Sequence, residues 1–318
     1  MTTNLLHTSR SRIQRIVARV RANWPRIPPQ DTRAHTWARR LDKYQDLPEL
    51  YRPFFDALSA QHTEPFPHTV LTPTFKDIPR RAEREKLVCL LGDELLILEH
   101  LDDHLAETRF PLNGRCFVER GVILLQAWIT IRGKAPDGGL KSATLRFNSV
   151  TDHIMTPFVD RLRPAPAAAS VVDLDAERER FNYLAQTHYK FYSHGRSSIR
   201  PGARVHHLLL QPEIRRTHFT FLGYSLSRRL SPAHLLVMTD AELIDIRDDE
   251  TQYWLKGAAH GAIWTYMPRS VIRNASLRPL ENQLLSLRIE VAGDIHVTST
   301  FEPQAEPQLQ RLLQEVRT

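Results

Sequence analysis

The chain has 318 residues, enough for two domains of ordinary size and an additional segment. Its 42% hydrophobic and 25% charged residues are typical of a folded protein and exclude a disordered chain. The formal net charge is +7, and residues 1–60 hold eleven Arg and Lys against five Asp and Glu, so we expect electrostatic attraction to anionic partners to concentrate there.

The sequence predicts no passage through a membrane. Arginines interrupt residues 10–26 repeatedly, so we expect no signal peptide. The longest apolar run, residues 122–131, is shorter than the roughly 20 residues that span a bilayer, and it predicts one buried strand. Cys89 and Cys116 lack metal-ligand spacing, which favours two reduced thiols. We therefore expect a cytoplasmic protein, and association with the periphery of a membrane stays open.

The first predicted element is an amphipathic helix at residues 9–24. Apolar side chains recur at helical spacing on one face and arginines fall on the other; these positions are Ile13, Ile16, Val17, Val20 and Trp24 against Arg12, Arg15 and Arg19. Prolines end this helix, and a second is expected at about 32–44. The apolar face could lie on an anionic membrane, or it could pack on this protein or on a second copy in a homodimer.

Beyond this basic region the chain contains an internal repeat. Residues 85–98 align without gaps with residues 233–246, a shift of 148 positions, and flanking segments align with shifts of 139 and 154. Loop insertions account for the changing shift, so the sequence predicts two related units joined by a linker rich in proline and alanine. The expected divisions are 1–62 for the basic helical region, 63–164 for the first unit, 165–200 for the linker and a connecting helix, and 201–318 for the second unit.

Each unit is predicted to contain six or seven short strands followed by one helix. Turn residues interrupt the apolar runs every 8–15 positions, which is typical of antiparallel sandwiches and barrels. Tight hairpins are expected at 87–98 and 235–246. The closing helices have one apolar face each, formed by Met155, Phe158, Val159 and Leu162 in the first unit and by Leu309, Leu312, Leu313 and Val316 in the second. The predicted fold class is mainly β (α+β).

This order of elements resembles the pleckstrin-homology-like fold, most closely its bacterial and GRAM-like branches. The residues that carry the resemblance are Pro201-Gly202-Ala203-Arg204-Val205 before a strand and the hairpin that contains Thr239-Asp240. The first unit has Leu91-Gly92 at the latter place, so its assignment depends on the internal similarity. The resemblance implies two partly open β-barrels, each capped by a C-terminal helix, in a protein that binds phosphoinositides, peptides or partner proteins without catalysis.

Lipid-binding relatives of this kind hold the headgroup on basic side chains after the first strand. Arginine and lysine on one loop suit phosphate, and the sequence has such residues in both units: Lys76, Arg80 and Arg81 in the first, and Arg215, Arg216, Arg228 and Arg229 in the second. Asp77, Glu83 and Glu85 offset the first group, whereas no acidic residue occurs between Ile214 and Thr239. An ordinary solvated basic loop is the alternative in each unit.

The sequence offers no positive indication of an enzyme, a metal site or a cofactor. It lacks an HExxH helix, a Walker loop, a GxGxxG turn, a GxSxG elbow and paired CxxC motifs. The acidic and histidine residues between Glu99 and His104 have no fixed metal-ligand spacing. Nucleic acid is not favoured either, because the basic segments lack aromatic interleaving and a reader motif.

The leading hypothesis is therefore a non-catalytic binding or scaffold module that recruits the protein to an anionic membrane surface or to a protein partner. The alternatives are a structural module that forms homo-oligomers without lipid and, third, an uncharacterised enzyme.

Overall fold

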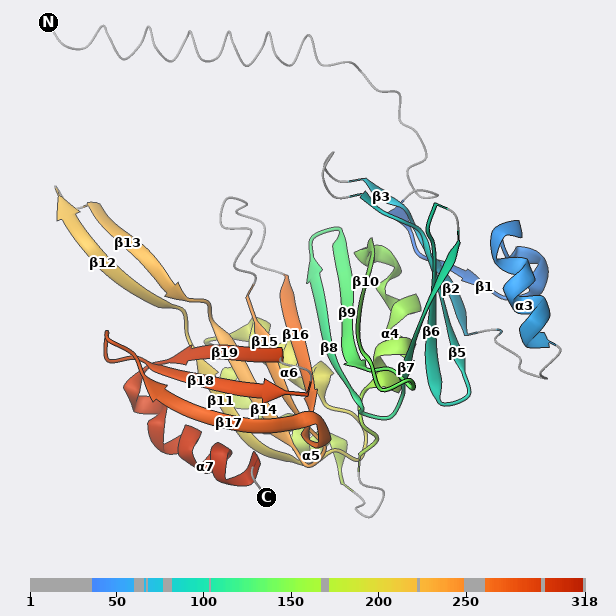
Figure 1. Ribbon diagram of the computed structural model, residues 1–318. Helices are drawn as coiled ribbons and strands as arrows, with labels where there is room; N and C mark the ends of the chain where they lie inside the picture. Colours follow the sequence, from blue (N-terminus) through green and yellow to red (C-terminus); the bar gives the residue numbers. More distant parts are fainter. Residues whose placement is uncertain are drawn as a thin grey trace, which may run out of the picture. The chain divides into compact units, whose positions relative to one another are not determined.

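The protein is built mainly from β-strands, as the sequence predicts (Figure 1). The computed structural model describes residues 36–59, 66, 68–76, 82–102, 104–166, 172–221, 224–248, 261–292 and 295–316, which all belong to one unit, His35–Thr318. The predicted helix at 9–24 lies outside these residues. Within them the strands form five open sheets, and none of these sheets closes into a barrel.

The first sheet contains the opening strands of the first repeat. Five antiparallel strands follow the order β1-β2-β5-β6-β7, with bounds β1 Arg39–Leu41, β2 Thr69–Thr72, β5 Lys86–Leu91, β6 Glu94–His100 and β7 Leu105–Pro111. The hairpin predicted at 87–98 is confirmed: β5 and β6 pair around Gly92, whose φ of 55° is accessible to glycine at little cost. The helix expected at 32–44 is wrong for its described part, because Arg39–Leu41 extends this sheet as an edge strand.

The second sheet joins the two halves of the chain. Seven strands follow the order β10-β9-β8-β16-β15-β14-β11. Their bounds are β8 Cys116–Ile123, β9 Gln126–Lys134, β10 Leu140–Asn148, β11 Val205–Gln211, β14 His234–Thr239, β15 Glu242–Arg247 and β16 Ala262–Pro268. The joint is the antiparallel pair β8–β16, in which Val118 lies opposite Tyr266 and Arg120 opposite Trp264. A single sheet therefore runs through both repeats.

The apolar run at 122–131 is not the single strand expected from the sequence. Ile123 pairs with Gln126, so the chain reverses at Leu124 and Leu125 and divides the run between β8 and β9. Neither turn residue is a glycine or asparagine, and composition alone therefore gave no indication of the turn.

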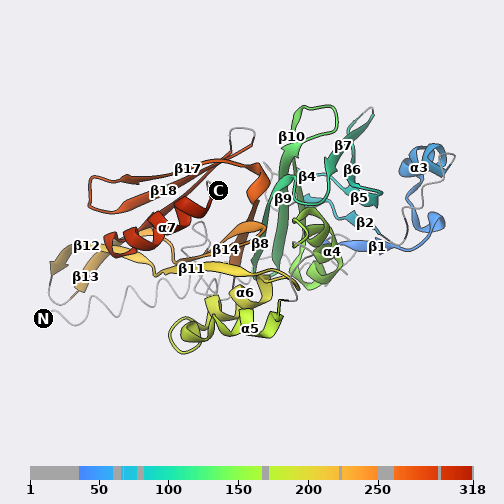
Figure 2. The same cartoon turned by 90° about the horizontal axis from the view of Figure 1, so that it is seen from below.

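A three-stranded sheet and a helix complete the second repeat. β17 Ile272–Pro279, β18 Leu285–Val291 and β19 Ile295–Phe301 form an antiparallel sheet, and helix α7 Glu306–Val316 packs against β17 (Figures 1 and 2). In the first repeat the corresponding helix is α4 Asp152–Leu162. The two helices are related by the shift of 154 positions, and the predicted apolar positions of both lie in cores.

Helical segments cover the outer faces of the opening strands in both repeats. In the first, α3 Arg52–Ser59 brings Phe55 against Leu71 and Leu87. In the second, α5 Leu174–Glu179 and α6 Tyr189–Ser198 follow the linker, and α6 contacts β14 and β15. The inner residues of β14 alternate between two hydrophobic cores: Leu235 and Val237 lie in one, Leu236 and Met238 in the other. Because both of its faces are covered in this way, all six residues of β14 are buried.

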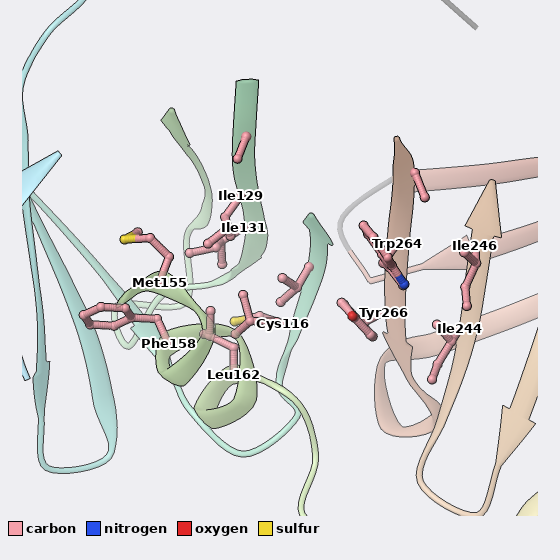
Figure 3. Packing of buried hydrophobic residues seen from close by; sticks show 14 of the residues in the cluster. Cys116, Ile129, Ile131, Met155, Phe158, Leu162, Ile244, Ile246, Trp264 and Tyr266 are labelled. Atoms are coloured by element: carbon pink, nitrogen blue, oxygen red, sulfur yellow. The ribbon is translucent and has the colours of Figure 1, made fainter. Parts of the chain in front are cut away.

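The largest hydrophobic core lies at the β8–β16 joint. Figure 3 shows Met155, Phe158 and Leu162 of α4 among residues of β8 and β9, with Trp264 and Tyr266 projecting from β16. Because this core has side chains from both repeats, the joint is stabilised by apolar burial as well as by backbone pairing.

Candidate functional site

A two-stranded ribbon leaves the second repeat between β11 and β14. Its strands are β12 Ile214–Phe221 and β13 Tyr224–Ser231, which pair with each other and with no other strand in the described ranges. Figure 1 shows the ribbon projecting away from the larger sheets. Ser231 Oγ donates to the Thr300 carbonyl over 3.5 Å at the base of the ribbon. The segment expected as a long basic loop is thus a β-ribbon, because its Thr, Phe, Tyr and Leu residues support extended pairing.

The four arginines predicted in this segment meet as two cross-strand pairs. Arg215 lies opposite Arg229, and Arg216 lies opposite Arg228. Like charges placed directly opposite one another destabilise an antiparallel pair unless a counter-charge is present. Among the described residues, acidic side chains accompany the first pair and none accompanies the second.

Glu213 lies between the two arginines of the first pair and offsets part of their charge. Its Oε1 lies 3.0 Å from Nε of Arg215 and 3.1 Å from Nε of Arg229. Arg229 also approaches Asp248, which pairs with Lys190 of α6. Only 16% of the Arg229 side chain is exposed, so it helps to fix the ribbon to the body. Sequence reasoning missed Glu213 because it lies one residue before the acid-free stretch.

The second pair stays available to a ligand. Arg216 and Arg228 are both exposed, and neither forms an ion pair with any residue that the structure describes. Two guanidinium groups on neighbouring strands can each donate forked hydrogen bonds to phosphate or carboxylate oxygens. This arrangement can hold an anionic group at the side of the ribbon.

The other predicted site residues are not brought together by the described part of the chain. Lys76 ends the short strand β3 Phe75–Lys76, which pairs with β4 Ala82–Glu83. Arg80 and Arg81 fall outside the described residues, as do all the residues chosen in the predicted helix at 9–24. The membrane or partner role of both groups stays a prediction.

A cavity of about 310 Å³ lies between β11, α7 and the segment after α5. Its polar lining is Arg180, Tyr183, His206, His207, Gln308 and Arg311. Arg180 is occupied by Glu177, 3.3 Å away, and by the Val205 carbonyl. Two guanidinium groups line this cavity, and the one of Arg180 already has partners within the protein.

Neither a metal cluster nor a membrane-spanning helix emerges from the described residues. No group of three or more His, Cys, Asp and Glu side chains among them converges as metal ligands would. None of the helices in the described ranges is long and apolar enough to cross a bilayer.

No protein-family model and no curated protein sequence matches this chain.

Proposed function

We propose that the protein is a non-catalytic binding module that attaches to anionic membrane surfaces through Arg216 and Arg228 of the β12–β13 ribbon. The observation that carries the proposal is their direct opposition without a described counter-charge. An anionic lipid headgroup would supply the missing charge. The outer half of the ribbon contains Phe219, Phe221 and Tyr224 in sequence, residue types that favour a membrane interface.

We further propose that both repeats are variants of the pleckstrin-homology-like fold. The order of elements supports this: four strands, then three strands, then one helix in each repeat. In the first these are β2, β5, β6 and β7, then β8, β9 and β10, then α4; in the second they are β11, β14, β15 and β16, then β17, β18 and β19, then α7. In this view the ribbon is an insertion after the first strand of the second repeat, where lipid-binding relatives place their basic residues.

The expected energy is modest and measurable. A basic residue close to an anionic membrane contributes about 1 kcal/mol, so loss of both arginines corresponds to roughly 30-fold weaker binding. The attraction should weaken as salt screens the charges.

Sedimentation with lipid vesicles tests the proposal. The double variant R216E/R228E should lose binding to vesicles that contain phosphatidylglycerol, whereas R132E/K134E should retain it. The control pair is also exposed but lies on β9, away from the ribbon. Equal binding by R216E/R228E would contradict the assignment of the ribbon. Failure of the native protein to bind any vesicle would contradict the membrane surface and favour a protein partner.

A further inference from the structure

The turn between β8 and β9 exposes two leucines. The exposed fraction is 52% for Leu124 and 62% for Leu125. Val150, which follows β10, is 50% exposed. Its neighbour Ser149 hydrogen-bonds to the carbonyls of both turn leucines, at 2.6 Å from Oγ to Leu124 and 3.0 Å from N to Leu125. The three apolar side chains therefore belong to one small protrusion.

The backbone at this turn disfavours the residue that it carries. Leu124 has a φ of 53°, in the left-handed region, whereas Leu125 does not share this conformation. A two-residue hairpin with positive φ at its first position ordinarily has glycine there. Leucine at such a position is strained, and its exposure to water brings no compensating burial. Folding and solubility thus both disfavour leucine at this position, which favours a binding role for its side chain.

Hydrogen bonds make the protrusion rigid. Ser149 fixes both turn carbonyls, and the Asn148 side chain accepts from the Val150 N–H at 3.0 Å. A rigid apolar group loses little conformational entropy when it is buried by a partner.

The protrusion and the arginine ribbon emerge from the same end of the seven-stranded sheet. One row of paired residues crosses the sheet at this end. From β8 to β11 it contains Val122, Ala262 and Ile263, Arg247, His234 and Gln211. The turn follows directly after this end of β8, and the ribbon follows Gln211. With strands about 4.8 Å apart, the two features start roughly 19 Å from each other along the sheet edge. Figure 1 shows both on the upper side of the view.

We propose that Leu124, Leu125 and Val150 form an apolar wedge that inserts into the interfacial zone of the anionic membrane held by Arg216 and Arg228. This inference rests on the proposed function. The arginines provide an attraction that salt screens, and the wedge adds an apolar contact that salt does not screen. Two contacts at one sheet end also define an orientation of the protein on the membrane.

The first test replaces the two leucines of the wedge with residue types that such a turn ordinarily contains. The variant L124G/L125S should bind phosphatidylglycerol vesicles roughly tenfold or more weakly at high salt, because burial of leucine side chains drives partitioning. Its thermal midpoint should not fall, since glycine relieves the strained φ. The control L140S removes a leucine of equal exposure, 52%, from the other end of β10. If L124G/L125S binds these vesicles at high salt as strongly as the native protein does, the proposed wedge is wrong.

A local probe separates failure of the wedge from failure of the proposed function. Cys89 and Cys116 are buried, and burial raises the pKa of both thiols to about 12, so a cysteine introduced at the surface can be labelled selectively. An environment-sensitive dye at L125C should shift to the blue when phosphatidylglycerol vesicles are added, and one at D137C should not. Vesicle binding without a shift at L125C would overturn the wedge and leave the ribbon in place. Absence of any vesicle binding by the unlabelled native protein would overturn both.

Discussion

Arg163 and Glu242 form a buried, bidentate ion pair between the two repeats. Nε of Arg163 donates to Oε1 of Glu242 over 3.1 Å and to Oε2 over 3.2 Å, and their exposed fractions are 5% and 4%. The guanidinium also donates to the Ser198 carbonyl over 2.7 Å and lies 4.2 Å from the ring centroid of Tyr266. Burial alone would lower the pKa of Arg163, but the charge of Glu242 raises it overall and keeps the side chain cationic. Since Arg163 follows α4 and Glu242 begins β15, the pair fixes the end of the first repeat to the second.

Removal of one partner should be costly, whereas removal of both should be tolerated. Glu242→Ala leaves a buried guanidinium without its counter-charge, which we expect to lower the free energy of unfolding by about 3–5 kcal/mol. The double variant R163M/E242L replaces the pair with apolar side chains and should recover much of that loss. Urea unfolding of the native protein, both single variants and the double variant gives the coupling between the two sites. Additive losses would show that the two side chains act independently.

Replacement of Gly195 in α6 by alanine should lower the stability of the protein, although the same replacement usually stabilises a helix. Alanine ordinarily stabilises a helix interior by about 0.5–1 kcal/mol relative to glycine. At Gly195, however, an added Cβ would lie 2.4 Å from Cε1 of Phe181 and 3.1 Å from Cδ2 of Leu235, both buried. We expect Gly195→Ala to destabilise the protein by about 1–3 kcal/mol through overpacking. A rise in the thermal midpoint of this variant would show that α6 is not held closely against the sheet.

His194 should make the stability depend on pH in mildly acidic solution. Burial lowers its pKa to about 4 from an ordinary 6.5; Lys190 and Arg120 act in the same direction, and Asp248 opposes them. The native imidazole therefore stays neutral while the unfolded one takes up a proton below about pH 6.5. Its contribution is fully present above that pH and is lost as the pH falls towards 4. His194→Gln should show a smaller drop in unfolding free energy between about pH 7 and pH 5 than the native protein, when both are measured by urea titration. Identical drops would mean that other groups account for the pH dependence.

The elements that sequence reasoning predicted well are those with a local pattern. The hairpin around Gly92 and the apolar faces of α4 and α7 follow from turn chemistry and helical periodicity, which are set within a few residues. The shifts between the repeats also hold in three dimensions: Leu71 pairs with Leu87, and their counterparts Leu210 and Leu235 pair in the second repeat.

The features that could not be predicted from the sequence depend on distant parts of the chain or on departures from ordinary turn chemistry. The β8–β16 joint connects Val118 with Tyr266, and no local pattern records a pairing over that separation. The turn at Leu124 lacks glycine and asparagine, so the run around it resembles one strand. The arginine segment is expected as a loop from its sequence, and only the cross-strand register shows which arginine lies opposite which.

A variant with a shortened ribbon tests whether vesicle binding depends on the ribbon or on the rest of the protein. Arg215 and Arg229 lie opposite one another, so residues 216–228 can be replaced by Asn-Gly, which closes a two-residue hairpin between them. The ion pairs of Glu213 with both arginines remain in this variant. Among the strands that the structure describes, those of the ribbon pair with each other alone, and we therefore expect the midpoint of thermal unfolding to change little. Binding to phosphatidylglycerol vesicles at low salt should be lost as completely as in R216E/R228E. If the shortened protein still binds, the anionic surface is recognised elsewhere, and vesicle binding by a protein that lacks residues 1–34 would then test the basic N-terminal segment.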